Sequence, residues 1–294
     1  MTTITITAPA GSRVSGDGIR TYPWHGRDLL SVTSAFKKAG LSHRVHTWAI
    51  SQVVARATGE ADILNAMLTR ERRPRERVLE KNRIAEASSW LRSAATEERD
   101  RKANIGSAVH EAAALALRPD DIPDVMETIK DGRPIVIDGH EVRTRLAQFH
   151  HWLHASGAVV LAQEFQVFNL TAGYGGSGDI LVGFTGGRVA LVDLKTGNSV
   201  LSEHVLQLHG YAGAEFSGRL GEVDDQVTGL LRSVTDLGIL HLAGDHWEYL
   251  GLRDDDTAFP AFLGALTYAQ WLSANGEIET CIAGRRTNRI EAAA

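Results

Sequence analysis

Cysteine is almost absent from the sequence: Cys281 is the only one among 294 residues. A single thiol cannot form a disulfide within the chain, and so few cysteines are typical of proteins outside oxidising compartments. The sequence also lacks any run of eighteen apolar residues, and its start, MTTITITAPAGS, has neither the basic nor the apolar part of a secretory leader. Together these absences favour a cytoplasmic protein without a membrane segment.

An excess of positive charge is missing as well. The chain has 31 Lys and Arg against 36 Asp and Glu, a formal net charge of -5. Binding to nucleic acid would therefore depend on a local basic patch. One basic run exists between Arg70 and Arg83, where seven Arg or Lys accompany three Glu. Four arginines of this run have two possible roles: Arg72, Arg73, Arg75 and Arg77. They either form a solvated helix face with i,i+4 ion pairs or contact DNA phosphates, and both interpretations stay open.

What the sequence does contain is a short apolar strand that ends in two charged residues. Residues 189–196 are β-branched and apolar, and they are opened by Gly186-Gly187 and closed by Gly197-Asn198. This punctuation is typical of a buried strand. Residues two apart on a strand share a face, so Asp193 and Lys195 point the same way. Buried charges in such a place need a partner or a function.

The preceding segment, residues 178–184, is predicted to pair with this strand as a hairpin. A two-residue loop at Gly186-Gly187 would place Asp179 opposite Leu194, on the wrong face. A register shifted by one residue places Asp179 opposite Asp193 instead. If both aspartates hold one metal ion, we expect a three-residue loop or a bulge here.

A third carboxylate, Glu164, lies among apolar neighbours in the strand predicted over residues 159–168. It can converge with Asp179, Asp193 and Lys195 if the three strands are neighbours. Oxygen-rich clusters suit hard cations such as Mg²⁺ or Mn²⁺, which activate water and neutralise the charge of a phosphate. The sequence therefore predicts a divalent-metal site at these strands, with a lysine beside it.

Further motifs flank this cluster on both sides. In chain order the set is Gly-x-x-x-His (Gly106, His110), Glu164, Gly-x-x-Asp (Gly176, Asp179), Asp-x-Lys-Thr (Asp193, Lys195, Thr196) and Gln-x-x-x-Tyr (Gln207, Tyr211). In this order and spacing the sequence resembles, over residues 101–212, the RecB-like branch of the PD-(D/E)XK nuclease superfamily, which includes CRISPR-associated and phage exonucleases. A softer likeness to phage members precedes it, where an aromatic-rich segment leads into Ser31-Val32-Thr33.

The resemblance implies a fold and a role for each site residue. The fold is α/β, with a mixed central β-sheet flanked by helices, built on the restriction-endonuclease-like αβββαβ core. The metal, Mg²⁺ or Mn²⁺, would be held by His110, Asp179, Asp193 and the Leu194 carbonyl. Lys195 would orient or deprotonate the attacking water. The remaining catalytic residues would assist: Glu164, Gln207 and Tyr211.

The resemblance also implies a function, a divalent-metal-dependent DNA exonuclease of phage or bacterial recombination and repair. It would act on DNA in the cytoplasm, or in the host cytoplasm if the protein is phage-encoded, and it is compatible with a homo-oligomer and with a recombination partner protein. Several members of this family hold an iron–sulfur cluster on four cysteines, so with one cysteine no cluster is expected. Two alternatives remain: a structure-specific endonuclease of the same fold, and an inactive DNA-binding or scaffold protein, which the complete Asp, Asp-x-Lys set disfavours.

Glycine and proline breaks, together with the periodicity of the hydrophobic residues, divide the rest of the chain into segments. Residues 1–19 are expected to be disordered, 20–100 to form a mostly helical elaboration, 101–275 the nuclease core, and 276–294 a mobile tail. Predicted helices span residues 45–68 with a break at Gly59, 85–102, 107–117, 142–155, 205–216 and 259–274. Residues 228–232 and a hairpin of 238–242 with 246–250 are predicted strands. Residues 125–139 are ambiguous between a short helix and a turn or strand.

Overall fold

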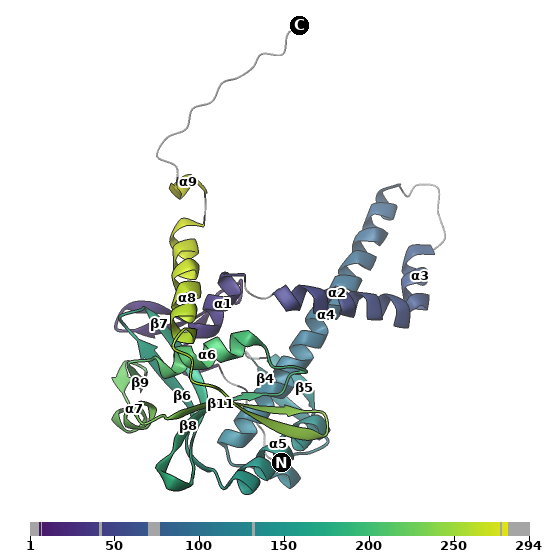
Figure 1. Cartoon of the computed structure of the whole chain (residues 1–294). Helices are drawn as coiled ribbons and strands as arrows, with labels where there is room; N and C mark the ends of the chain where they lie inside the picture. Colours follow the sequence, from purple (N-terminus) through teal and green to yellow (C-terminus); the bar gives the residue numbers. More distant parts are fainter. Residues whose placement is uncertain are drawn as a thin grey trace.

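A computed structural model of the chain (Figure 1) describes residues 6, 8–40, 43–69, 77–130, 133–276 and 278–281. Within these residues, ten strands form one mixed sheet and two more form a separate hairpin. Helices cover the sheet, so the expected α/β class with a mixed central sheet is confirmed. None of the helices within the described ranges is both long and apolar enough to cross a membrane.

The centre of the sheet is an antiparallel meander. It consists of β6 (Val159–Asn169), β7 (Tyr174–Gly183) and β8 (Val189–Lys195), which are the three strands predicted from the sequence. Next to β8 lies β11 (Asp236–Ala243), which runs parallel to it, and β12 (His246–Gly251) completes that side. The predicted hairpin near residues 238–250 is thereby confirmed.

The N-terminal strands join the same sheet and create a fork in it. They are β1 (Arg13–Val14), β2 (Arg20–Trp24) and β3 (Arg27–Ser31). β3 runs parallel to the start of β7 at Tyr174 and Gly175, while β8 pairs with its end, from Ile180 to Gly183. Since β6 occupies the other edge of β7, β3 and β8 share one edge. Between them, at residues 176–179, no described strand pairs with that edge.

Two layers of helices enclose the sheet. On one face lie α1 (Val32–Lys38), α6 (Ser202–Ala212) and α8 (Ala258–Asn275), over a core that includes Tyr174, Leu191 and Phe262. On the other lie the C-terminal part of α4 (Arg77–Ala114) and α5 (Gly139–Ser156), around Trp152 and Val192. The Ser31 side chain accepts from the Ser34 backbone N–H at 3.0 Å and so caps α1.

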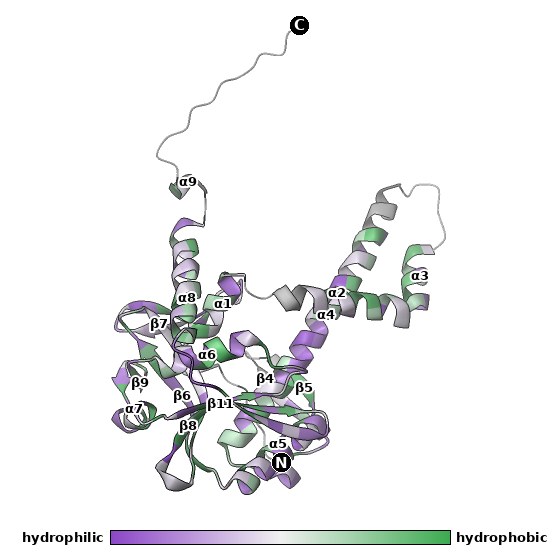
Figure 2. Ribbon diagram, viewed as in Figure 1, coloured by the Kyte–Doolittle hydropathy of each residue, from purple (hydrophilic) through white to green (hydrophobic). Residues whose placement is uncertain are grey.

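A helical arm projects from this body (Figure 1). It consists of α2 (His43–Gly59), α3 (Ala61–Thr69) and the N-terminal part of α4. The predicted break at Gly59 is confirmed, and Arg56 ties α2 to α4 by donating to the Trp90 carbonyl at 3.0 Å. No residue of α3 is buried, and Figure 2 shows hydrophobic residues on it. The arm therefore presents apolar surface away from the sheet.

Several predicted elements differ from the structure. The helices expected over residues 85–102 and 107–117 are parts of the single helix α4, so the boundary expected at residue 100 falls inside a helix. Gly106 does not end the helix, because one glycine in a helix interior costs only about 1 kcal/mol. The chain ends, expected to be disordered, are described in part: β1 lies within residues 1–19, while residues 1–5, 7, 277 and 282–294 lie outside the described residues.

Three further corrections concern local signals. Residues 225–232, predicted to include a strand, form helix α7 (Asp225–Arg232), because Asp224 accepts from the Val227 N–H at 2.9 Å and caps it. The ambiguous residues 125–139 form a hairpin of β4 (Val125–Lys130) and β5 (Arg133–Asp138). Finally, α6 ends at Ala212, and the chain continues into β9 (Phe216–Arg219) and β10 (Glu222–Val223).

Two glycines of the sequence motifs are sites of close packing between elements. A Cβ added at Gly176 would lie 2.5 Å from the Tyr211 ring, and one added at Gly106 would lie 2.9 Å from Thr196 Oγ1. Real Cβ atoms do not approach other atoms this closely. The absence of a side chain at these glycines therefore allows α6 to lie against β7, and α4 to lie against the end of β8.

Replacement of Gly176 by alanine is expected to destabilise the protein by about 1–3 kcal/mol, the usual cost of overpacking a core. The matched control is Gly229→Ala in α7, where an added Cβ meets nothing within 4 Å. Alanine in an open helical position should stabilise by about 0.5–1 kcal/mol. Urea unfolding of both variants measures the difference, and equal stabilities would contradict the packing role of Gly176.

Candidate functional site

Three side chains from separate elements meet at the fork in the sheet. His110 comes from α4, Glu164 from β6 and Asp179 from β7, and each offers one ligand atom within 4.8 Å of the other two. His110 Nδ1 lies 3.1 Å from Glu164 Oε1 and 3.6 Å from Asp179 Oδ1. One imidazole and two carboxylates form a donor set that suits a divalent cation.

Glu164 reaches this group from a distorted position in β6. Its neighbours Gln163 and Phe165 pair with Ile180 and Gly178, so the register places Glu164 opposite Asp179. Its φ of 48° lies in the left-handed region, which is rare for a residue with a side chain. Backbone strain of this kind collects at functional sites, where the surrounding structure maintains it.

The β7–β8 hairpin has the register required for a shared site. Ile180 pairs with Val192 and Gly183 with Val189, and the Phe184 N–H donates to the Arg188 carbonyl at 2.8 Å. The loop therefore has three residues, 185–187, as expected if Asp179 and Asp193 were to face each other. The Leu194 N–H donates to Asp179 Oδ2 at 2.7 Å, and the Leu194 carbonyl lies 3.2 Å from His110 Nε2.

Asp193 and Lys195 form the second half of the site. Asp193 is 1% exposed, and its Oδ2 lies 2.6 Å from the Lys195 ammonium, although neither carboxylate oxygen has a hydrogen bond of good geometry. Burial raises the pKa of Asp193 against the opposing effect of Lys195. Burial works against the charged form of Lys195, but Asp193 and Asp179 outweigh it and raise the pKa of the lysine. Lys195 is thus held as a cation.

A polar chain along α6 supports the lysine. Lys195 donates to Gln207 Oε1 at 3.4 Å, and Gln207 Nε2 donates to the Tyr211 hydroxyl at 2.8 Å. Gln207 and Tyr211 lie four residues apart, on one face of the helix. Burial raises the pKa of Tyr211, and Asp193 and Asp179 raise it further. The phenol therefore stays protonated beside the carboxylates.

The residues present could hold one divalent cation. A cavity of about 10 Å³, the volume that one water molecule or small ion needs, is bordered by His110, Glu164, Asp179 and Leu194. Asp193 Oδ2 is paired with Lys195, whereas Oδ1 is a buried acceptor without a hydrogen bond that a cation or its water would satisfy. Both the size of the cavity and its donors are compatible with a hard divalent ion.

The sequence-predicted residues divide between these two halves. His110, Asp179 and Leu194 lie together as expected. Glu164, predicted only to assist, belongs to the three-residue ligand group, whereas Asp193 lies on the Lys195 side and outside that group. Arg72, Arg73 and Arg75 lie outside the described residues, and Arg77 begins α4 without a described side chain.

Two neighbours of the site were not identified from the sequence. His204, in the first turn of α6, accepts from the Leu201 N–H at 3.2 Å through Nδ1, and burial together with Lys195 lowers its pKa to about 4. Burial raises the pKa of Tyr22 in β2 to about 12; Arg20 opposes this rise and Glu164 adds to it. The available signals were the position of His204 three residues before Gln207 and the aromatic content of residues 20–24.

Comparison with known proteins adds little to this description. No family model matches the chain, and no curated protein matches it. Among solved structures, the crystal structure of SSO0001 is similar over 44% of this chain, at 14% sequence identity and a TM-score of 0.29. The match spans 57% of that chain, and a likeness this low supports no inference about fold or function.

The charge balance of the site predicts a pH dependence of stability. Burial lowers the pKa of His110, but Asp179 and Glu164 outweigh burial and raise it to about 9 from an ordinary 6.5. The stabilisation by protonated His110 is therefore complete below about pH 6.5 and is lost as the pH rises through about 9, by on the order of 3 kcal/mol. Urea unfolding in EDTA at pH 6.5 and 9.5 measures this loss.

The controls for this prediction are two histidine variants. His110→Gln should remove most of the pH dependence between pH 6.5 and 9.5, whereas His154→Gln, at an exposed position of α5, should keep it. Parallel stability curves for wild type and His110→Gln would show that His110 does not carry a raised pKa.

Proposed function

We propose that the protein is a divalent-metal-dependent deoxyribonuclease of the PD-(D/E)XK superfamily, an exonuclease that hydrolyses phosphodiester bonds in DNA recombination or repair. One observation carries the proposal: His110, Glu164 and Asp179 converge at the fork, next to the buried Asp193–Lys195 pair. A metal-binding group and a fixed ammonium side by side suit the cleavage of a phosphodiester.

The architecture supports the same assignment. The resemblance implies an αβββαβ order, and helix α4, strands β6 to β8, helix α6 and strand β11 follow this order, with β4, β5 and α5 inserted before β6 and with β9, β10 and α7 inserted before β11. Each of the five motifs contributes at the fork. All five do so through polar side chains, and two of them also contain a glycine, Gly106 or Gly176, that permits close packing.

His110, Asp179, Glu164 and the Leu194 carbonyl would hold the metal ion. The bound ion would supply Lewis-acid chemistry, lowering the pKa of a water molecule and neutralising charge on the phosphate. Asp193 would be available to it or to its water through Oδ1, which has no hydrogen bond, while Oδ2 is paired with Lys195. The Leu194 N–H keeps the Asp179 carboxylate oriented toward this position.

Lys195 would position rather than deprotonate the attacking water. Its raised pKa keeps it charged at neutral pH, and a charged ammonium is a donor only. Gln207 and, behind it, Tyr211 fix the direction of this donor. The lysine can then hold the nucleophilic water or a non-bridging phosphate oxygen without taking up a proton.

The test of the proposal is cleavage of linear and circular duplex DNA in Mg²⁺ or Mn²⁺. An exonuclease degrades the linear duplex and spares the closed circle, whereas a structure-specific endonuclease of the same fold would cut at flaps, forks or single-stranded regions. An inactive DNA-binding scaffold, the alternative from another class, would bind both forms and cut neither. The complete set of Asp179, Asp193 and Lys195 speaks against that alternative.

Asp193→Ala and Lys195→Arg are each expected to lower the cleavage rate by more than about 100-fold while DNA binding persists. The first removes a carboxylate whose main role is toward the cation, and the second replaces a compact ammonium by a planar fork that cannot place a water in the same way. Asp236→Asn in β11, a carboxylate away from the fork, is the matched control and should cleave normally. Near-wild-type rates for Asp193→Ala would exclude the assigned site.

The basic run offers a separate test of the DNA path. If Arg72, Arg73, Arg75 and Arg77 contact phosphates, changing two of them to Gln should flatten the slope of log affinity against log salt by about 2 units. If they only form a solvated helix face, the slope should stay the same and stability should change by about 0.5 kcal/mol or less. Titrations of a short duplex at several salt concentrations, in the Asp193→Ala background, distinguish these outcomes.

A further inference from the structure

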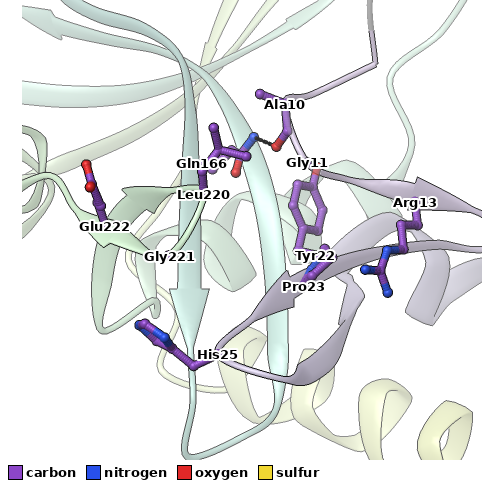
Figure 3. A pocket seen from close by; sticks show the side chains of 10 residues that line it. All are labelled: Ala10, Gly11, Arg13, Tyr22, Pro23, His25, Gln166, Leu220, Gly221 and Glu222. Atoms are coloured by element: carbon purple, nitrogen blue, oxygen red, sulfur yellow. Dashed lines mark hydrogen bonds between the residues drawn. The ribbon is translucent and has the colours of Figure 1, made fainter.

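A hollow of about 580 Å³ lies beside β6, away from the ligand group (Figure 3). It is bordered by Ala10, Gly11 and Arg13 of the N-terminal segment, by residues 22, 23 and 25, by Gln166 of β6, and by the turn between β9 and β10. Its size falls within the range of small-molecule binding sites. Apart from Tyr22, a neighbour of the candidate site, none of its lining residues belongs to that site.

The rim of the hollow contains two residues in an unusual backbone conformation. His25 and Leu220 have φ values of 43° and 54°, each directly before a glycine that also has a positive φ. A turn that needed only the left-handed conformation would be better served by Asn or Gly. Leu220 is 71% exposed, and the His25 ring packs edge-on against Trp24, with 5.4 Å between the two ring centroids. Leu220 and His25 therefore stand at the rim although neither residue type favours a positive φ.

The polar groups of the hollow favour a neutral ligand. Gln166 is 6% exposed, and its Nε2 donates to the Ala10 carbonyl at 2.8 Å, which leaves Oε1 as an acceptor (Figure 3). Arg13 is engaged by Asp28 at 3.2 Å, and Glu222 adds a negative charge. The lining therefore offers acceptors and apolar faces, with its one arginine already paired, and this suits a planar neutral group with N–H donors better than a phosphate.

The hollow continues the candidate site along the same strand. Gln166 follows Glu164 by two residues, which on a strand is a distance of about 7 Å. Tyr22 lies between the two: it lines the hollow, and its Cβ would lie 3.0 Å from a Cβ added at Gly175, the residue of β7 directly before the fork. A chain molecule with one unit at the ligand group could place the next unit in the hollow.

We propose that this hollow receives a nucleobase of the DNA strand, adjacent to the nucleotide whose phosphate lies at Lys195. The proposal rests on the proposed nuclease function. The base would lie against Leu220 and His25 and donate an N–H to Gln166 Oε1. Base faces are common to all four nucleotides, so the hollow would position the strand with little dependence on its sequence.

An abasic scan tests the proposal. A short single strand carries one tetrahydrofuran abasic residue, moved stepwise from either end, and its binding is measured in the Asp193→Ala background so that the strand is not cut. We expect one position at which loss of the base weakens binding by about tenfold, the usual effect of one stacked base. The affinity for each abasic strand is compared with the affinity for the unmodified strand.

Two variants connect that position to the hollow. Leu220→Gly and His25→Asn remove the rim side chains, and both new residues adopt positive φ readily. In each variant the abasic penalty should shrink to less than about twofold, while Val223→Ala, an exposed apolar residue of β10 outside the hollow, should keep it. A penalty that persists in both rim variants would place the base elsewhere and overturn the proposal.

The outcomes also separate this proposal from the proposed function. Wild-type protein that cleaves DNA but shows no abasic-sensitive position overturns the base pocket alone. Protein that does not cleave, yet shows a penalty abolished by Leu220→Gly, supports the pocket and rejects the nuclease. Protein that neither cleaves nor binds the strand rejects both.

Discussion

Mutual repulsion among buried carboxylates is the constraint on which the site depends. Asp193 is almost completely buried, and burial together with the nearby Asp179 raises its pKa. Three groups balance this negative charge. They are the Lys195 ammonium, the His110 imidazole, whose raised pKa favours its protonated form, and the Leu194 N–H, which donates to Asp179. A divalent cation would replace the proton on His110, because a metal ligand must present a neutral imidazole. Metal and proton therefore compete for one position.

The same constraint explains why the scaffold is tight around the fork. Carboxylates that repel each other stay in place only if the elements that carry them cannot move apart. Gly176 and Gly106 allow α6 and α4 to approach the strands so closely that no side chain fits between them. These motif glycines permit the close packing that brings the polar motif residues together at the fork.

Much of the central site was predictable because it depends on local rules. Alternation along residues 189–196 gave the shared face of Asp193 and Lys195, and the arithmetic of the hairpin gave the three-residue loop. Glu164 was expected to converge with Asp179 and does so, but its φ of 48° was not predictable, because alternation assumes a regular strand. Helix α7 was missed because four β-branched or apolar residues near Thr228 resemble a strand, and the cap at Asp224 outweighs that preference.

The pairing of the N-terminal strands with the central sheet was not predicted. Pairing between segments that are distant in the chain leaves little signal in the local sequence. Residues 20–31 were expected to belong to a helical elaboration, yet β3 runs beside β7 and forms one side of the fork. Tyr22 packs so closely on Gly175 that a Cβ there would lie 3.0 Å from the Tyr22 Cβ. The fork therefore exists only when the N-terminal strands are in place. It follows that a fragment starting near residue 101, although it contains every motif of the resemblance, lacks one wall of the site, and that the N-terminal part belongs to the same folding unit as the motif strands.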